Sequence, residues 1–339
     1  MTKVSICIPA YKQVQFLRVT LESIRSQQFT DYEVNITDDS PDDSVEQLVK
    51  EFPLDGRMRY CRNPKQLGSP ENWNECIRSA RGELIKIMHH DDHFTDADSL
   101  GSFVDMLDAH PEADFAFSAT CVEDYATKLT RIHRPTEKQL ATLGDRPQML
   151  FAGNCIGAPS VTIYRRSMKI EYDREMKWLV DIDFYIRALE LNSRFIYMSK
   201  PLIATPTNVP HQVTELCRDN ADIELFEYYR LFSKLTPLQR DDKYVKVKWM
   251  HLFIKYGIHR SSDLRRYDVG QPHDAEYFRL LLKKIIKLRL LTLFYRLYPH
   301  LPSFIRAPIR WMRNRWNNVS NLSLIIFFSN NLKYSASCG

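Results

Sequence analysis

Two adjacent carboxylates, Asp91 and Asp92, follow a short apolar segment and stand beside three histidines, His89, His90 and His93. Like charges this close raise each other's pKa, so such a pair is favourable where a cation lies beside it. Oxygen ligands with room for water and phosphate oxygens suit Mg²⁺ or Mn²⁺. The pattern therefore predicts a divalent-cation site. The alternative is a loop of solvated acids that caps the next helix.

A second acidic pair, Asp38 and Asp39, ends another short apolar segment. A carboxylate fixed at the end of a strand can accept hydrogen bonds from a base N–H or a ribose hydroxyl. Alternatively one of the two caps the helix that follows, but Asp42, Asp43 and Ser44 are available for that role. Asp38 and Asp39 are therefore candidates for binding a nucleoside.

A third pair, Asp181 and Asp183, opens a segment with apolar residues at helical spacing. An acid in this position can simply favour the positive end of a helix. Two acids that are two positions apart on a helix point in different directions, so we expect at most one to face a site. That carboxylate is a candidate general base, able to take a proton from a hydroxyl group.

The acidic pairs at residues 38–39 and 91–92 stand at the ends of predicted strands that alternate with predicted helices. Strands are expected at 4–9, 33–37, 58–62 and 83–88, and helices at 15–28, 43–52 and 70–80. Alternation of this kind predicts an α/β fold with a mostly parallel sheet and helices on both faces. Ligands of such sheets bind beyond the carboxyl ends of the strands.

The second half of the chain continues this pattern and then becomes helical. We expect helices at 99–110 and 178–191, strands at 114–119, 161–165 and 195–198, and a loop containing Gly and Pro at 154–160. From Asp219 onward the pattern is helical throughout. The sequence thus predicts an α/β domain over residues 1–215 and a helical, basic region over residues 216–339.

Charge is distributed unevenly along the 339 residues, although the net charge is only +5. The last acidic residue is Glu276, and residues 277–339 contain 11 Lys and Arg. Over residues 279–316 these cations alternate with apolar and aromatic residues at helical spacing, which is typical of a helix in a membrane interface. Packing of these helices on the α/β domain is the alternative. No nucleic-acid-binding motif accompanies the charge.

Four phrases in order resemble the family 2 glycosyltransferases, an inverting family with the GT-A nucleotide-sugar fold. They are VSICIPAYKQVQFLRVTLESIRSQQFTDYEVNITDDSPDDS, GELIKIMHHDDHF, NCIGAPSVTIYRR and WLVDIDFYIRAL, and the resemblance covers residues 3–215. It implies a GT-A (Rossmann-like) sheet flanked by helices. The activity it implies is transfer of a sugar from a nucleotide-sugar donor with the aid of Mg²⁺ or Mn²⁺.

The resemblance implies a nucleotide-binding role for the ends of the first two strands. Pro9, Ala10 and Tyr11 match the family's first loop, which lies against the nucleotide. Asp39 matches the acid that reads the base, and Asp38 stands beside it.

The resemblance also assigns the metal and the base. HHDD takes the place of the DxD motif, so Asp91 is expected to bind the cation that bridges the donor diphosphate. Asp92 is expected to support Asp91 or to contact the ribose or the sugar, and His89 stands where the motif usually has its first Asp. Asp181 aligns with the acid of the ED motif, preceded here by Val180, and is the predicted catalytic base.

Four further residues and one alternative complete the predicted site. Asp183 is the alternative base. Asn154, Gly157 and Ser160 match the loop that meets the acceptor and the donor sugar, and His211 matches a loop that closes over the diphosphate.

The predicted function is sugar transfer, from UDP as the expected carrier, to a saccharide or polyprenyl-linked acceptor. The resemblance to the family also suggests a role in the biosynthesis of a bacterial surface polysaccharide, such as O-antigen. The chain starts directly with a strand pattern and has no apolar run of about 20 residues, so we expect a cytoplasmic protein that associates peripherally with the inner face of the plasma membrane. The alternative is a catalytically degenerate GT-A-like carbohydrate-binding or scaffold protein, since two motif acids are replaced. A nucleotidyltransferase would need a glycine-rich loop after the first strand, which this chain lacks.

Overall fold

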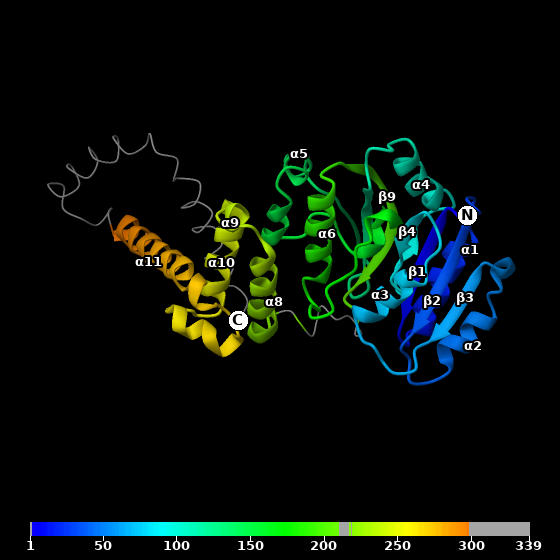
Figure 1. Cartoon of the computed structure of the whole chain (residues 1–339), viewed down its shortest axis with the longest axis horizontal. Coiled ribbons are helices and arrows are strands. Elements are labelled where there is room, and N and C mark those ends of the chain that lie inside the picture. Colours follow the sequence, from blue (N-terminus) through cyan, green and yellow to red (C-terminus); the bar gives the residue numbers. More distant parts are fainter. Residues whose placement is uncertain (1, 210–216, 218, 298–339) are drawn as a thin grey trace. The chain divides into compact units, whose positions relative to one another are not determined.

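The computed structural model describes residues 2–209, 217 and 219–297. The chain divides into two compact units, residues 1–248 and 249–339. The first unit contains the whole sheet and every described residue of the predicted site (Figure 1). Among the described helices, none is long and apolar enough to cross a membrane.

Four strands form the parallel part of the sheet. In spatial order they are β3 (Met58–Arg62), β2 (Tyr32–Asp38), β1 (Val4–Ala10) and β4 (Leu84–Ile87). Every residue of β1, β2 and β4 is buried, as expected for strands that are covered on both faces. Ala10 pairs with Asp38 and Cys7 pairs with Ile87. The segments that follow β1, β2 and β4 therefore leave the sheet at the same edge.

Helices cover both faces of this parallel part. Helices α1 (Val14–Arg25) and α2 (Ser44–Lys50) connect strands that step in one direction across the sheet, whereas α3 (Glu71–Arg78) precedes the step back to β4. Right-handed crossovers therefore place α3 on the opposite face from α1 and α2. In agreement, α1 packs on α2, while α3 packs on β1 and β2.

The rest of the sheet is mixed. Strand β8 (Thr162–Arg165) runs antiparallel to β4 and to β6 (Phe115–Asp124), and β6 runs parallel to β9 (Phe195–Thr207). Two short strands complete the sheet: β5 (His93–Phe94) pairs with β9, and β7 (Thr130–His133) pairs with β6. The predicted strands ended too early at residues 119 and 198, because β6 and β9 continue together past a register irregularity near Ala119.

The remaining helices are, in chain order, α4 (Ser99–Asp108), α5 (Glu137–Leu143), α6 (Val180–Leu191), α8 (Ala221–Lys234), α9 (Pro237–Arg240), α10 (Lys243–Lys255) and α11 (Ala275–Leu297). Helix α4 packs on β6 and β9, and α6 carries the third acidic pair. The predicted α/β fold, with a mostly parallel sheet flanked by helices and a helical C-terminal region, is confirmed. The predicted boundary at residue 215 stays a prediction.

In the second unit α11 packs through aromatic contacts. The ring of Phe278 lies 5.0 Å from that of Trp249 and 5.8 Å from that of Phe253. Leu281 and Ile285, one and two turns further along α11, are also buried. Other apolar residues of α11, such as Leu280 and Ile286, are exposed, so the helix has both a buried and an exposed apolar part.

Candidate functional site

The segment after β4 brings His89, Asp91 and Asp92 together. Each offers a ligand atom, and these atoms all lie within 4.8 Å of one another. The turn is closed by a hydrogen bond from the Asp92 N–H to the His89 carbonyl (3.1 Å). Thr20 of α1 holds this turn, since its hydroxyl lies within hydrogen-bond distance of two carbonyl oxygens, those of Asp92 (2.7 Å) and His90 (3.0 Å), and donates to one of them. This arrangement matches the predicted divalent-cation site in its position.

Burial makes this group electrostatically unusual. Asp92 is 1% exposed, and no donor among the described residues meets full hydrogen-bond geometry with its carboxylate oxygens, although the Ser160 and Thr205 hydroxyls lie close enough to affect its pKa. Burial, and next the charge of Asp91, raise the pKa of Asp92 to about 7, although Ser160, Thr205 and Lys86 act in the opposite direction. Burial lowers the pKa of His89 to about 4, so its imidazole is neutral and able to bind a metal.

These residues fit a divalent cation. Two carboxylates and one neutral imidazole are a donor set that Mn²⁺ and Mg²⁺ accept, with positions left for water or phosphate oxygens. The buried Asp92 oxygens have no well-formed hydrogen bond from the described residues, and a cation would offset the cost of keeping them charged. The solvated-loop alternative does not account for an acid that is this buried.

A buried lysine behind this group was not predicted. Lys86 lies on β4 and is fully buried. Its ammonium donates to the carbonyl oxygens of Ser160 and Ile87 and faces the ring of Phe103 at 4.6 Å. Burial lowers the pKa of Lys86 to about 7, against the charge of Asp92. The signal in the sequence was a cation inside an apolar strand, which a core position tolerates only when the charge is balanced.

Ser160 joins the predicted acceptor loop to the end of β4. Its hydroxyl oxygen accepts a hydrogen bond from the His89 N–H (2.9 Å), and its carbonyl accepts one from Lys86. Gly157 has a φ of +122°, and an added Cβ would lie 3.2 Å from the Val161 side chain. Glycine is therefore needed here for both conformation and space. Contact of this loop with the acceptor or the donor sugar stays a prediction.

Asn154 links the same loop to Asp181 at the start of α6. Its amide donates to Asp181 Oδ2 (2.7 Å) and to the Gly157 carbonyl (2.9 Å), and its oxygen accepts from the Gly157 and Ile156 N–H groups (2.9 Å each). The other Asp181 oxygen accepts from the Ile182 N–H (2.8 Å). Burial raises the pKa of Asp181 to about 6, and the bonds from Ile182 and Asn154 hold it below a higher value.

Tyr185 connects the surroundings of Asp181 with those of the cation-binding group. The hydroxyl of Tyr185, one turn along α6, donates to the Gly157 carbonyl (3.0 Å). Burial raises the pKa of Tyr185, and the charges of Asp181 and Asp92 add to this effect. The pKa of the Tyr185 phenol is therefore affected by both carboxylates. A carboxylate with a pKa of about 6, beside a cation site, is able to act as a base near neutral pH.

Asp183 occupies a different environment. It is fully buried and makes ion pairs with Lys234 of α8 (2.5 Å) and with Arg187 (2.7 Å). Both of its oxygens are therefore held by cations, and they join α6 to α8. Nearby, Glu227 of α8 accepts hydrogen bonds from three N–H groups that precede α6, at Lys177, Trp178 and Leu179 (2.8 Å each). This buried capping acid was not predicted from the sequence.

The residues predicted to contact the nucleoside already have partners within the protein. Asp38 is fully buried and accepts hydrogen bonds from the Ser40 N–H and the Tyr60 hydroxyl (2.8 Å each). Asp39 accepts from the Asn63 amide (2.6 Å) and the Gly68 N–H (2.7 Å), so it shapes the loop between β3 and α3.

The first predicted loop is mostly covered. Pro9 and Ala10 are buried in β1, and the side chain of Tyr11 is exposed at the strand end. Nucleoside binding by these residues remains a prediction. His211 lies outside the described residues.

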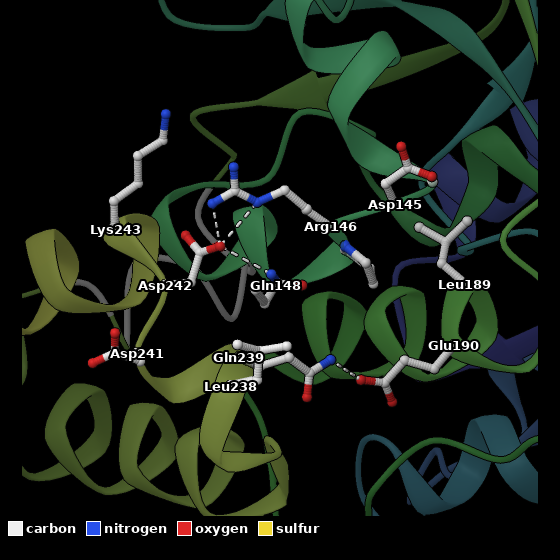
Figure 2. Close-up of a pocket in the computed structure, with 12 residues that line it drawn as sticks. Asp145, Arg146, Gln148, Leu189, Glu190, Leu238, Gln239, Asp241, Asp242 and Lys243 are labelled. Atoms are coloured by element: carbon white, nitrogen blue, oxygen red, sulfur yellow. Dashed lines mark hydrogen bonds and ion pairs between the residues drawn. The ribbon is translucent and has the colours of Figure 1, made fainter.

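A separate cavity of about 610 Å³ lies at the other end of α6 (Figure 2). Its walls come from residues 144–148, the C-terminal turn of α6, α9 and the start of α10. Figure 2 shows Arg146 and Gln148 pointing toward Asp242, and Gln239 pointing toward Glu190. No predicted site residue lines this cavity. Asp181 lies nine residues away from Glu190 along the helix, about 13 Å.

Comparison with known proteins adds a family match to this geometry. The family model of glycosyl transferase family 2 matches residues 5–172. The abequosyltransferase RfbV of Salmonella typhimurium is 23% identical over 300 residues, which cover 78% of this chain and 86% of RfbV. A Mycobacterium tuberculosis protein of uncharacterized activity is 28% identical over 202 residues, and the match spans 55% of this chain and only 61% of that protein.

Two solved structures share the fold. S. aureus TarS 1–349 in complex with UDP-GlcNAc has a TM-score of 0.58 at 17% identity, with coverage of 84% of this chain and 81% of that chain. The mannosyltransferase PcManGT from Pyrobaculum calidifontis, in complex with GDP-Man and Mn²⁺, has a TM-score of 0.53 at 16% identity and covers 94% of this chain and 88% of its own. At these identities the likeness concerns the fold alone.

Proposed function

We propose that this chain, which belongs to glycosyltransferase family 2 and is a nucleotide-sugar glycosyltransferase, transfers its sugar with inversion to a hydroxyl of a saccharide or lipid-linked acceptor. The observation that carries the proposal is the pairing of two centres at one edge of the sheet. His89, Asp91 and Asp92 form a cation-binding group, and Asp181 is held beside it by the Asn154 loop.

His89, Asp91 and Asp92 would hold Mg²⁺ or Mn²⁺, with Asp91 as the principal ligand. When bound, the metal offsets the negative charge that develops on the nucleoside diphosphate leaving group. The Mn²⁺ complex of PcManGT supports this choice by analogy of fold. Ser160 and Lys86 orient the backbone of this group, because they bind the His89 N–H and the Ser160 carbonyl respectively.

Asp181 is the proposed base. Its carboxylate takes the proton of the acceptor hydroxyl as the oxygen attacks the anomeric carbon, on the face opposite the diphosphate. The hydrogen bond from Asn154 orients the carboxylate and favours its charged form. Asp183 is not suited to this role, because both of its oxygens are held by Lys234 and Arg187. A single displacement of this kind inverts the configuration at the anomeric carbon.

On the nucleotide side we propose contacts from Pro9, Ala10, Tyr11, Asp38 and Asp39. Only Tyr11 among them presents an exposed side chain, 38% accessible, so it is the strongest candidate for stacking on the base. UDP is the proposed carrier, which the UDP-GlcNAc complex of TarS supports by analogy of fold. The match over most of the abequosyltransferase RfbV supports the transfer of a sugar. We further propose a saccharide acceptor and a role in surface-polysaccharide synthesis, such as O-antigen.

We also propose that the basic C-terminal helices bind a membrane surface, and that residues 1–215 are the catalytic part. The exposed face of α11 carries Lys283, Lys284, Lys287 and Arg289 together with the exposed Ile286. Cations beside exposed apolar side chains are suited to anionic lipid headgroups, at about 1 kcal/mol per basic residue. Such contact would keep the enzyme at the inner face of the plasma membrane, near a polyprenyl-linked acceptor.

The experiment that tests the proposed function is a thermal-shift and turnover screen of UDP-, dTDP-, GDP- and CDP-sugars with Mn²⁺ or Mg²⁺. We expect one carrier to stabilise the wild type only when metal is present, and Asp91→Ala to abolish that effect. Asp55→Ala is the control, since Asp55 is a highly exposed acid remote in sequence from the site. If no sugar nucleotide binds with either metal, the degenerate scaffold becomes the better account.

A further inference from the structure

Trp73 is held in a defined orientation by the two asparagines beside it on α3. The Asn72 amide donates to the carbonyl oxygens of Ala10 (3.3 Å) and Thr37 (3.2 Å), which anchors α3 to the ends of β1 and β2. Asn74 makes a reciprocal pair with the backbone of Tyr172, donating to its carbonyl (2.9 Å) and accepting from its N–H (2.8 Å). Both asparagines are buried, whereas Trp73 is partly exposed.

The indole ring contacts His89 of the candidate site and a neighbouring tyrosine, Tyr172. Its centroid lies 4.5 Å from the imidazole of His89 and 5.0 Å from the ring of Tyr172, which meets it edge-on at 87°. Tyr172 is itself stacked on Phe184 of α6 at 4.3 Å. The indole is therefore packed against both rings and lies beside the cation-binding group.

Tyr172 relates the indole to the proposed base. Burial raises the pKa of Tyr172, and the charge of Asp181 is the next contribution, so the phenol lies within the field of that carboxylate. Trp73 therefore contacts His89 of the cation-binding group and also Tyr172, whose pKa is affected by the charge of Asp181. In an in-line displacement the transferred sugar lies between the leaving diphosphate and the base. The contact with His89 places the indole next to the residues proposed to bind the cation.

An indole in this position has a suitable chemistry for a sugar. Its face accepts the apolar C–H side of a pyranose ring, and its N–H can donate a hydrogen bond to a hydroxyl. We propose that Trp73 is the platform on which a pyranose ring stacks during transfer, an inference that rests on the proposed function. Packing alone does not account for two buried amides that fix the direction of a ring which remains partly open to solvent.

The test compares Trp73→Ala, Trp73→Phe and wild type in full-length protein with Mn²⁺. Affinity is measured by calorimetry for the nucleoside diphosphate and for the matching sugar nucleotide, and KM and kcat are measured for donor and acceptor. We expect Trp73→Ala to bind the diphosphate within about twofold of wild type. One sugar substrate should lose about tenfold in affinity or KM, and Trp73→Phe should recover most of the loss. A change confined to the donor assigns the donor sugar to the platform, and one confined to the acceptor assigns the acceptor sugar.

Trp249→Phe is the control for lost aromatic packing, because Trp249 is buried in the second unit. The platform is refuted if Trp73→Ala leaves every sugar affinity and KM unchanged. It is also refuted if the affinities for diphosphate and sugar nucleotide fall by the same factor. The same holds if Trp73→Phe recovers none of the lost affinity while both Trp73 variants have a Tm as low as that of Trp249→Phe. If wild type binds no nucleotide at all, the proposed function fails and the platform fails with it. If wild type binds nucleotides and the Trp73 variants do not differ from it, only the platform fails.

Discussion

Replacing Asn154 by alanine tests how the proposed base is tuned. The hydrogen bond from the Asn154 amide to Asp181 Oδ2 is 2.7 Å long and stabilises the charged carboxylate, whose pKa is about 6. A hydrogen bond to a charged group contributes about 1.5–3 kcal/mol, and one pKa unit corresponds to about 1.4 kcal/mol. Because Asp181 is partly exposed and water replaces some of the lost bond, we expect the pKa to rise by about one unit.

The sign of the pH effect follows from the role of Asp181 as a base. Only the deprotonated carboxylate accepts a proton, so activity increases as pH rises through its pKa. With a pKa near 6 in wild type and about 7 in Asn154→Ala, the active fraction at pH 6 falls about fivefold. At pH 8 the two proteins should differ by less than about 1.5-fold through this effect.

The assay is kcat as a function of pH from 5 to 9 at saturating donor, acceptor and Mn²⁺. Comparison at the same metal concentration separates Asp181 from Asp92, which both proteins share. Asn154 also shapes its loop, so Asn154→Asp is the second variant. It keeps an acceptor for the Ile156 and Gly157 N–H groups but places a negative charge beside Asp181. This charge should raise the pKa of Asp181 further, so that kcat rises only at a still higher pH. The tuning of Asp181 by Asn154 would be refuted if kcat rose at the same pH in both variants as in wild type, or if kcat fell by the same factor at every pH.

Three other changes test the remaining parts of the account. Asp183→Ala removes the fully buried carboxylate that pairs with Lys234 and Arg187, whereas Lys234 keeps its ion pair with Asp173. The change should cost about 2 kcal/mol, seen as a lower Tm, while kcat at permissive temperature stays near wild type; a large loss of kcat in folded protein would restore Asp183 as the base. Gly157→Ala should displace the Asn154 loop, because φ is +122° and the new Cβ meets Val161, and kcat measured against Tm should fall more than stability alone explains. Glutamate at the three exposed lysines of α11 should weaken binding to phosphatidylserine vesicles on the order of a hundredfold and leave turnover of a water-soluble acceptor unchanged; equal vesicle binding would contradict the membrane proposal.

The fold could be predicted because its first half follows simple periodic rules. Apolar strands alternate with amphipathic helices, and each observed element from β1 to β4 lies within a few residues of its predicted range. The long strand β9 was only partly predicted, since Lys200 and Pro201 interrupt its apolar pattern. It persists because the register irregularity opposite β6 accommodates these residues. The two-residue β5 is too short to leave any periodic signal.

Prediction of the site was best for acids at strand ends and weakest for their supporting contacts. The grouping of His89, Asp91 and Asp92 follows from their adjacency in the chain. The contrast between Asp181 and Asp183 depends on Lys234, a cation about 50 positions away that no local pattern connects to α6. The same holds for Lys86, whose partner Ser160 comes from a distant loop. Such long-range pairs are fixed only by tertiary packing.

The proposed role of Asp181 as the base is tested most directly by one measurement. This is the rate at which Asp181→Asn releases nucleoside diphosphate in the presence of donor, acceptor and Mn²⁺. Asparagine keeps the shape of the carboxylate but cannot accept the acceptor proton. We expect a fall in kcat of about 10²–10⁴-fold with unchanged diphosphate affinity and unchanged Tm. Turnover at the wild-type rate by a correctly folded Asp181→Asn would contradict the assignment of Asp181 as the base beside the cation site.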